Sequence, residues 1–219
     1  MNKELVIFDL DGTLLNTLED LVDSTNFALK YFNFPTRSVS EVRNFVGNGV
    51  SKLIERAIPN GLNNEDFNQC LEIFKNHYSK NMCSKTKPYE GVIELLQILR
   101  HKEIKTAVVS NKFDTAVKNL CDKYFPSLID YACGENEAAG ICKKPATDMV
   151  FYALKHFGIS KERAVYVGDS EVDIQTAKNS KMDFISVTWG FKSEEFLIQN
   201  GAKHIISKPS QILDIIFQK

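Results

Sequence analysis

The chain alternates short, continuously apolar runs with amphipathic helical patterns, and this alternation constrains its fold more than any other feature. Apolar runs without polar alternation are typical of strands that are covered on both faces. When such strands alternate with helices, they form a parallel sheet in an α/β protein. Helical patterns lie at residues 90–102, 114–125 and 146–158. The apolar runs lie at residues 5–8, 106–110, 164–169, 184–189 and 204–207, with a weaker one at 129–134.

One interval, residues 11–105, is much longer than a single crossover helix requires. Apolar residues recur at helical spacing within 18–32 and again within 67–78. Ser38 and Glu41 have the spacing of a capping box, which begins a helix. We therefore expect a helical unit inserted after the first strand.

This expectation divides the chain into two domains. The insert covers residues 17–84, and the core domain is formed by residues 1–16 and 85–219. A length of 219 residues suits one large domain with a smaller insert.

Charge, hydropathy and cysteine spacing restrict the partners that this chain is expected to have. Its 27 basic and 28 acidic residues lack the basic excess of a nucleic-acid-binding protein. No run approaches the ~20 apolar residues that span a bilayer, so no membrane contact is expected. The five cysteines have no CxxC spacing and are interpreted as reduced thiols of a cytoplasmic protein. The sequence leaves open whether the protein is a monomer or a homodimer.

Polar side chains follow three of the predicted strands, at the edge of the sheet where ligands bind in open α/β folds. Asp9 and Asp11 follow the first strand, Ser110 follows the second, and Asp169 and Asp173 follow the strand at 164–169. If the strand order brings these ends together, the residues form one acidic cluster. Carboxylate oxygens are the ligands that magnesium (Mg²⁺) prefers, together with water and substrate phosphate.

Each of these residues also has a simpler structural explanation. Carboxylates after strands often stabilise the next turn, and a serine there often caps a helix. Asp169 and Asp173 lie where a helix N-terminus favours acidic residues, and Lys144 alone is typical of a solvated surface. Their joint occurrence at three strand ends favours one shared site.

Four segments, in this order along the chain, resemble the four motifs of the haloacid dehalogenase-like hydrolases. They are DLDGTL at 9–14, VVSNK at 108–112, KP at 144–145 and GDSEVD at 168–173. The resemblance covers the whole chain and implies a Rossmann-like parallel-sheet core with an all-helical cap inserted after the first strand.

Two further segments resemble the phosphoglycolate phosphatase branch of this family. They are VGNGVSKLIERAI at 46–58 and VTWGF at 187–191. The resemblance implies a phosphatase that acts on a small phosphate ester and needs Mg²⁺. The segment KPAT at 144–147 departs from the family pattern because it lacks a second proline, and Lys143 is a neighbouring alternative to Lys144.

The resemblance also implies a role for each acidic residue. Asp9 is the expected nucleophile that forms an aspartyl-phosphate. Asp11 is the expected general acid and then base, and its backbone carbonyl is expected to bind the metal beside the carboxylates of Asp9 and Asp169. Asp173 is expected to hold a metal-bound water or to orient Lys144.

The phosphate group is expected to contact five residues. Lys144 neutralises its charge, the Ser110 hydroxyl donates to it, and Asn111 lies beside them. Backbone N–H groups near Gly12 and Thr13 are further expected donors, because glycine lets the chain approach the phosphate closely. The resemblance therefore assigns catalysis to Asp9, Asp11, Ser110 and Lys144.

Substrate choice is expected to depend on a loop of the cap. Gly47, Asn48 and Gly49 lie between two predicted helices, and cap loops of this family contact the leaving group. An ordinary helix–helix turn explains the same residues equally well.

Other functions remain open at this stage. Dehalogenases of the family need neither a second aspartate nor a metal, and Asp11 and Asp169 argue against that branch. A β-phosphoglucomutase-like phosphomutase and a pyrophosphatase share the motifs. A non-catalytic phosphate-binding module is a more remote alternative, because no motif residue is missing.

Overall fold

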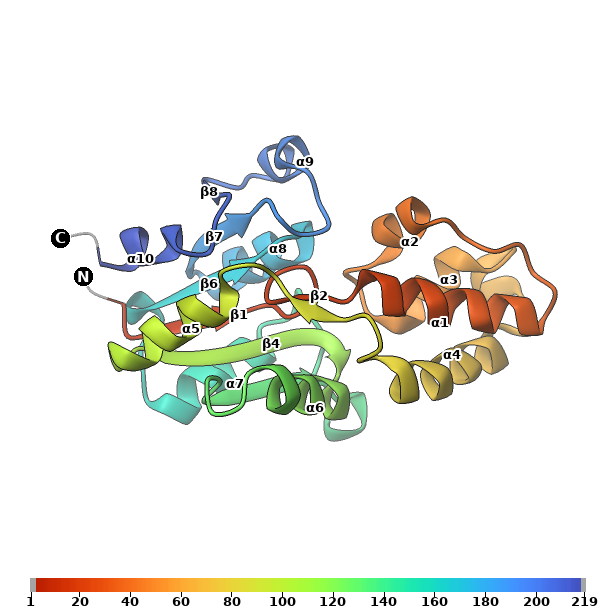
Figure 1. The fold of residues 1–219 in the computed structure, drawn as a ribbon, viewed down its shortest axis with the longest axis horizontal. Coiled ribbons are helices and arrows are strands. Elements are labelled where there is room, and N and C mark those ends of the chain that lie inside the picture. Colours follow the sequence, from red (N-terminus) through yellow and green to blue (C-terminus); the bar gives the residue numbers. More distant parts are fainter. Residues whose placement is uncertain (1–2, 218–219) are drawn as a thin grey trace. The chain divides into compact units, whose positions relative to one another are not determined.

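The computed structural model describes residues 3–217, which form two compact units (Figure 1). One unit contains the chain up to Leu15 and from Pro88 onward, and the other is Asn16–Lys87. The expected insert, residues 17–84, falls inside the second unit. Where the chain passes between the units, the short strands β2 (Leu15–Asn16) and β3 (Lys87–Pro88) pair with each other.

A six-stranded parallel sheet forms the centre of the first unit, and this confirms the predicted α/β class. The strand order is β5-β4-β1-β6-β7-β8, so the first strand of the chain lies inside the sheet, between β4 and β6. The strands are β1 (Leu5–Phe8), β4 (Lys105–Phe113), β5 (Tyr131–Glu135), β6 (Ala164–Gly168), β7 (Asp183–Val187) and β8 (His204–Ile206).

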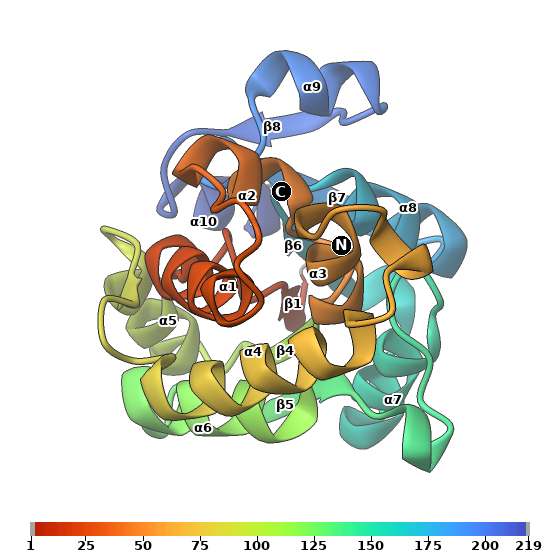
Figure 2. The same cartoon turned by 90° about the vertical axis from the view of Figure 1, so that its right-hand side faces the viewer.

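Helices cover both faces of this sheet, which explains why its strands are continuously apolar. In Figure 2, α5 and α6 lie on one side of the sheet and α7 and α8 on the other. Leu5 and Ile7 of β1 belong to one buried cluster with Met149 of α7 and Ala177 of α8. The helices of this unit are α5 (Val92–His101), α6 (Asp114–Tyr124), α7 (Asp148–Phe157), α8 (Glu171–Ser180), α9 (Glu194–Gln199) and α10 (Gln211–Ile216).

Strand β4 extends to Phe113, three residues beyond the predicted end at Ser110. Its pairing with β5 shifts register between Ser110 and Phe113, which marks a β-bulge. The bulge keeps Asn111 and Lys112 inside the protein, with 5% and 4% of their surfaces exposed. A pattern of alternating faces could not predict two consecutive buried polar residues.

The second unit is helical, as predicted. It contains α1 (Leu18–Tyr31), α2 (Val39–Phe45), α3 (Val50–Ala57), a 3₁₀ turn (Gly61–Asn63) and α4 (Phe67–Asn81). The predicted capping box before α2 is confirmed: Ser38 Oγ accepts from the Glu41 N–H, and the Glu41 carboxylate accepts from the Ser38 N–H.

The side chain of Asp20, on α1, binds the backbone of the last residues of this unit, just before β3. Its buried carboxylate accepts hydrogen bonds from the backbone N–H groups of Lys85 and Thr86, at 2.9 to 3.1 Å. These bonds satisfy backbone donors just before β3, where no helix or sheet supplies acceptors.

Within residues 3–217, no helix has the length and apolar character needed to cross a membrane. All five cysteines are free thiols.

Candidate active site

The two aspartates after β1 have different environments. Asp9 is 7% exposed, and its N–H donates to the carbonyl of Val167 at 2.9 Å, which continues the pairing of β1 with β6. Asp11 lies two residues further along, in the turn, and its side chain is 14% exposed. The strand therefore delivers Asp9 to the interior and leaves Asp11 closer to solvent.

Lys144 occupies the space between two carboxylates. Its Nζ is 2.8 Å from Asp9 Oδ1, 2.7 Å from Asp173 Oδ1 and 3.1 Å from the Tyr166 hydroxyl. Burial alone would lower the pKa of Lys144, but the charges of Asp173 and Asp9 raise it well above its usual value. This lysine therefore stays an ammonium. Of the two neighbouring lysines considered from sequence, Lys144 is the one for which the structure gives contacts with Asp9 and Asp173.

Asp173 has both carboxylate oxygens occupied by donors. Oδ2 accepts from the N–H and the hydroxyl of Ser170, which completes a capping box at the start of α8. Oδ1 accepts from Lys144 and from the Tyr166 hydroxyl. Asp173 thus has the helix-capping role considered from sequence and also contacts Lys144, and its role in orienting Lys144 stays a prediction.

Asp169 is held in the loop after β6 by donors from two other loops. Its Oδ2 accepts from the Phe191 N–H at 2.7 Å, and its Oδ1 accepts from the Thr13 hydroxyl at 3.3 Å. Two glycines leave room for this carboxylate: a Cβ at Gly12 or at Gly190 would collide with it. Gly12 also has φ +90°, a left-handed conformation that favours glycine.

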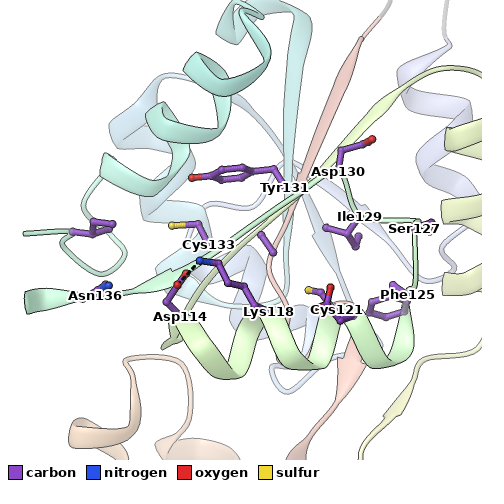
Figure 3. A pocket seen from close by; sticks show the side chains of 13 residues that line it. Asp114, Lys118, Cys121, Phe125, Ser127, Ile129, Asp130, Tyr131, Cys133 and Asn136 are labelled. Atoms are coloured by element: carbon purple, nitrogen blue, oxygen red, sulfur yellow. Dashed lines mark hydrogen bonds and ion pairs between the residues drawn. The ribbon is translucent and has the colours of Figure 1, made fainter. Parts of the chain in front are cut away.

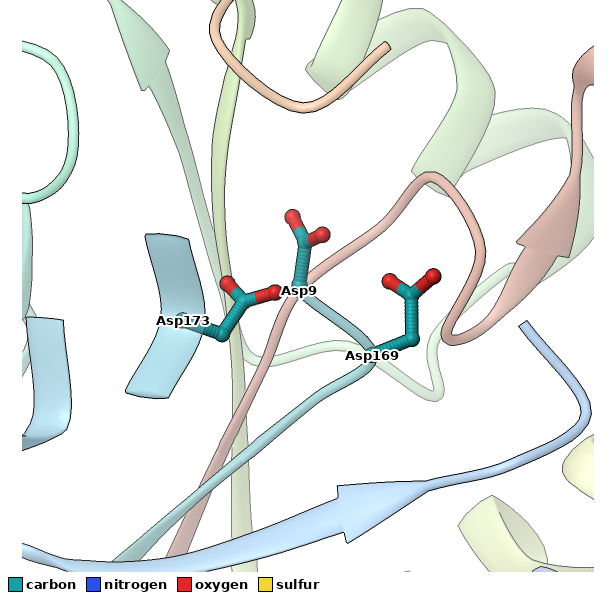
Figure 4. Close-up of side chains that lie close together, drawn as sticks. All are labelled: Asp9, Asp169 and Asp173. Carbon is teal, nitrogen blue, oxygen red and sulfur yellow. The ribbon is translucent and has the colours of Figure 1, made fainter. Parts of the chain in front are cut away.

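The carboxylates of Asp9, Asp169 and Asp173 project together at the ends of β1 and β6 (Figure 4), with one oxygen of each within 4.8 Å of the others. Burial raises the pKa of Asp9 to about 7, although the Lys144 ammonium opposes this shift. Burial and the charges of Asp173 and Asp9 raise the pKa of Asp169 well above its usual value. One ammonium does not offset three buried carboxylates, and a divalent cation would favour their ionised forms. Their oxygens are hard ligands, so these residues fit a Mg²⁺ site.

Ser110 and Asn111 lie at the carboxyl end of β4, beside the end of β1. Ser110 is 2% exposed, and its Oγ accepts from the Lys112 N–H. The Asn111 side chain exchanges two hydrogen bonds with the backbone of Lys144, with its Oδ1 2.6 Å from the Lys144 nitrogen. Asn111 therefore fixes the loop that carries Lys144, and its contact with phosphate stays a prediction.

The backbone N–H groups of Gly12 and Thr13 have acceptors inside their own turn. The Gly12 N–H donates to Leu15 at 2.9 Å, and the Thr13 N–H donates to Leu10 at 3.3 Å. Their expected role as phosphate donors stays a prediction. The contact that the structure describes for Thr13 is the hydroxyl bond to Asp169.

Sequence reasoning missed three residues that support the site. Lys112 forms an ion pair with Asp11, with its Nζ 3.1 Å from Oδ1. Tyr166 and Gly190 contact the charged residues described above. Lys112 and Gly190 lie in the segments VVSNK and VTWGF, which were singled out from the sequence, but no role was assigned to either residue. A lysine after a strand is usually solvated. Tyr166 lies in the apolar run at 164–169 and was interpreted as part of a buried strand.

The predicted specificity loop connects α2 with α3. Gly47 and Gly49 have φ +122° and +85°, so both adopt conformations that other residues rarely reach. The side-chain oxygen of Asn48 is buried and has no hydrogen-bond partner among the described residues. Such an oxygen can accept a hydrogen bond from a ligand.

A hollow of about 590 Å³ lies elsewhere in the first unit, along the edge strand β5 (Figure 3). Its lining includes the ion pair of Asp114 and Lys118 and two thiols, Cys121 and Cys133. Burial raises the pKa of Cys121 to about 12, so this thiol stays protonated and unreactive. The hollow does not include any residue of the carboxylate cluster.

Known proteins resemble this chain over nearly its whole length. Residues 6–187 match the family model described as haloacid dehalogenase-like hydrolase. A phosphoglycolate phosphatase of Colwellia psychrerythraea is 30% identical over 96% of each chain. One of Haemophilus influenzae is 30% identical over 97% of this chain and 98% of its own. A crystal structure from Lactobacillus delbrueckii subsp. bulgaricus, provisionally named a phosphoglycolate phosphatase, has a TM-score of 0.94 and 36% identity over all of both chains.

Proposed function

The chain belongs to the haloacid dehalogenase-like hydrolases, and we propose that it is a phosphatase whose Asp9 attacks phosphate monoesters. The observation that carries this proposal is the position of Lys144. Its ammonium lies 2.8 Å from Asp9 Oδ1 and leaves the second oxygen of the carboxylate available to a substrate. Two anions, a carboxylate and a phosphate, can approach each other only where fixed positive charge offsets their repulsion.

The first step transfers the phosphoryl group to Asp9. One carboxylate oxygen forms a bond to phosphorus while the bond from phosphorus to the ester oxygen breaks. Asp11, two residues further along the turn, donates its proton to the departing oxygen. Ser110 and Lys144 donate hydrogen bonds to the phosphoryl oxygens as charge moves onto them.

The second step returns Asp9 to its free state. Asp11 now lacks its proton and accepts one from a water molecule, which attacks phosphorus and releases inorganic phosphate. The same residue therefore serves as acid and then as base. Asp173 and Asn111 hold Lys144 in place through both steps, from its side chain and its backbone respectively.

Asp9 and Asp169 would hold Mg²⁺ with the backbone carbonyl of Asp11, and Asp173 would support the site from behind. Bound Mg²⁺ supplies positive charge that keeps the carboxylates ionised and stabilises charge on the phosphoryl oxygens. Asp173 suits a supporting role because both of its oxygens already accept hydrogen bonds within the protein.

We infer 2-phosphoglycolate, or a phosphate ester of similar size, as the substrate. The curated relatives of similar length that carry the name phosphoglycolate phosphatase support this inference. We further propose that residues 17–84 act as a cap and that Gly47, Asn48 and Gly49 help to select the leaving group. A cytoplasmic location and a small-molecule partner belong to the same proposal.

The nucleophile assignment is tested with 4-nitrophenyl phosphate, with and without Mg²⁺, on the wild type and on Asp9→Asn. We expect the variant to lose nearly all activity while it keeps its thermal stability. Undiminished hydrolysis by Asp9→Asn would refute the assignment. A panel of 2-phosphoglycolate, β-glucose 1-phosphate, pyrophosphate and nucleoside monophosphates then separates the phosphatase from the mutase and the pyrophosphatase.

A further inference from the structure

Lys112 is a buried cation that the proposed mechanism does not use. It lies in the bulge of β4, and only 2% of its side chain is exposed. Its Nζ is 3.1 Å from Oδ1 of Asp11. Gly134 on the neighbouring strand leaves room for this backbone, since a Cβ there would collide with the Lys112 carbonyl.

Stability is a weak reason to bury an ammonium there. Taking a lysine out of water carries a large desolvation penalty, and a buried salt bridge is weak evidence of a gain in stability. Bulges often occur beside active sites, where they redirect a side chain. Without the bulge, consecutive residues of β4 would point to opposite faces of the sheet. The bulge and the buried pair together suggest that Lys112 serves the site.

We propose that Lys112 is a positioning residue that fixes the carboxyl group of Asp11 for proton transfer to the leaving group. The ion pair engages Oδ1 of Asp11, and in this proposal the other oxygen carries the proton that is transferred. Because 14% of this side chain is exposed, a buried cation fixed beside it restricts the rotamers that the carboxyl group can adopt. General acid catalysis needs the acid within hydrogen-bond distance of the departing oxygen.

This inference rests on the proposed function, in which Asp11 is the acid. The proton passes from Asp11 to the ester oxygen as that oxygen leaves phosphorus, and a water proton later restores it. Lys112 keeps its own proton throughout and forms no bond to the substrate. Its effect should therefore depend on how much a substrate needs the acid.

The test compares two phosphate esters whose leaving groups differ in their need for a proton. Ethyl phosphate releases a poor leaving group that needs a proton, whereas 4-nitrophenyl phosphate releases a stable phenolate. The value of kcat/KM reports the steps up to departure of the leaving group. We expect Lys112→Met to lower kcat/KM about 10- to 100-fold for ethyl phosphate and less than about threefold for 4-nitrophenyl phosphate.

Several variants separate positioning from a general loss of structure. Lys112→Arg keeps the charge, and its ratio of the two kcat/KM values should stay close to that of the wild type. Lys118→Met, at a lysine of the same unit that pairs with Asp114 at 2.6 Å, should change neither value. If circular dichroism shows that Lys112→Met does not fold, the same measurements are made on Lys112→Gln.

A double variant tests whether Lys112 acts through Asp11. Asp11→Asn alone should show the same selective loss on ethyl phosphate. Adding Lys112→Met to it should then change kcat/KM by less than about twofold, since residues that act as a unit are not additive.

Two results would overturn the inference: an equal loss of kcat/KM on both esters, or a full additional loss in the double variant. If Asp11→Asn itself shows no preference for ethyl phosphate, the general-acid role within the proposed function fails instead. The two failures are therefore distinguishable.

Discussion

Replacement of Tyr166 by phenylalanine removes one hydroxyl from the centre of the charged network and leaves the ring in place. The hydroxyl accepts from Lys144 Nζ at 3.1 Å and donates to Asp173 Oδ1 at 3.0 Å. Burial raises the pKa of Tyr166 well above its usual value, so the group is a neutral phenol that donates as well as accepts. The ring is fully buried and packs near Phe184, and phenylalanine preserves that packing.

The expected loss of stability depends on which hydrogen bonds of the network the substitution leaves in place. A hydrogen bond to a charged group contributes about 1.5–3 kcal/mol. Two such bonds are lost, but Lys144 keeps its contacts with both carboxylates and Asp173 keeps its contact with Lys144. We therefore expect a destabilisation of about 2 kcal/mol, within the range for a single such bond. For a chain of this size, about 2 kcal/mol lowers Tm by about 4–8 °C.

Trp189 provides the assay for this prediction. It is the single tryptophan of the chain and lies in the same unit as Tyr166, so its fluorescence during urea unfolding reports on that unit. Tyr152→Phe is the matched control, because 45% of this tyrosine is exposed and a change there should stay within about 0.5 kcal/mol. If Tyr166→Phe is no less stable than Tyr152→Phe, the hydroxyl does not stabilise the network and the reasoning is wrong.

Three further predictions concern the metal and the cap. Gly190→Ala should weaken Mg²⁺ activation at least about tenfold, because the new Cβ displaces the carboxylate of Asp169; an unchanged Mg²⁺ titration would contradict this account. Removal of divalent ions with EDTA should abolish hydrolysis and lower Tm, and Mg²⁺ at about 100 times its Kd should restore about 2.7 kcal/mol in the wild type but not in Asp169→Asn. Gly49→Ala should reduce kcat/KM about tenfold for 2-phosphoglycolate and less for 4-nitrophenyl phosphate, because φ +85° there strains an alanine. Equal losses on the two esters would remove the loop from substrate selection.

The sheet was predictable because its strands are apolar on both faces. Continuously apolar runs such as residues 5–8 and 164–169 are typical of strands that are covered on both faces. The carboxyl ends of parallel strands lie at one edge of the sheet, so this interpretation placed Asp9, Ser110 and Asp169 together. The capping box at Ser38 was predictable for a similar reason, since both of its hydrogen bonds join residues three apart.

The supporting residues could not be predicted because their roles depend on distant partners. Lys112 is buried beside Asp11, which lies about a hundred residues earlier in the chain. The bulge that contains Lys112 could not be recognised from the apolar pattern. The strands β2 and β3 have two residues each, too few for a periodicity. The absence of a Cβ at Gly190 matters because the Asp169 carboxylate lies against it, and that contact is not visible in the sequence.

The inner position of β1 has a consequence for synthesis. The ribosome makes this strand before the other strands of the sheet, and both of its neighbours come much later. Lys144 lies 135 residues after the aspartate that it contacts. At a translation rate of about 5–20 residues per second, β1 waits about 5–20 seconds for β4 and about 8–30 seconds for β6. A nascent chain that stops before Asp173 cannot complete the charged network. Hydrolytic activity of this protein should therefore report the moment at which residues 144–173 have folded against strand β1.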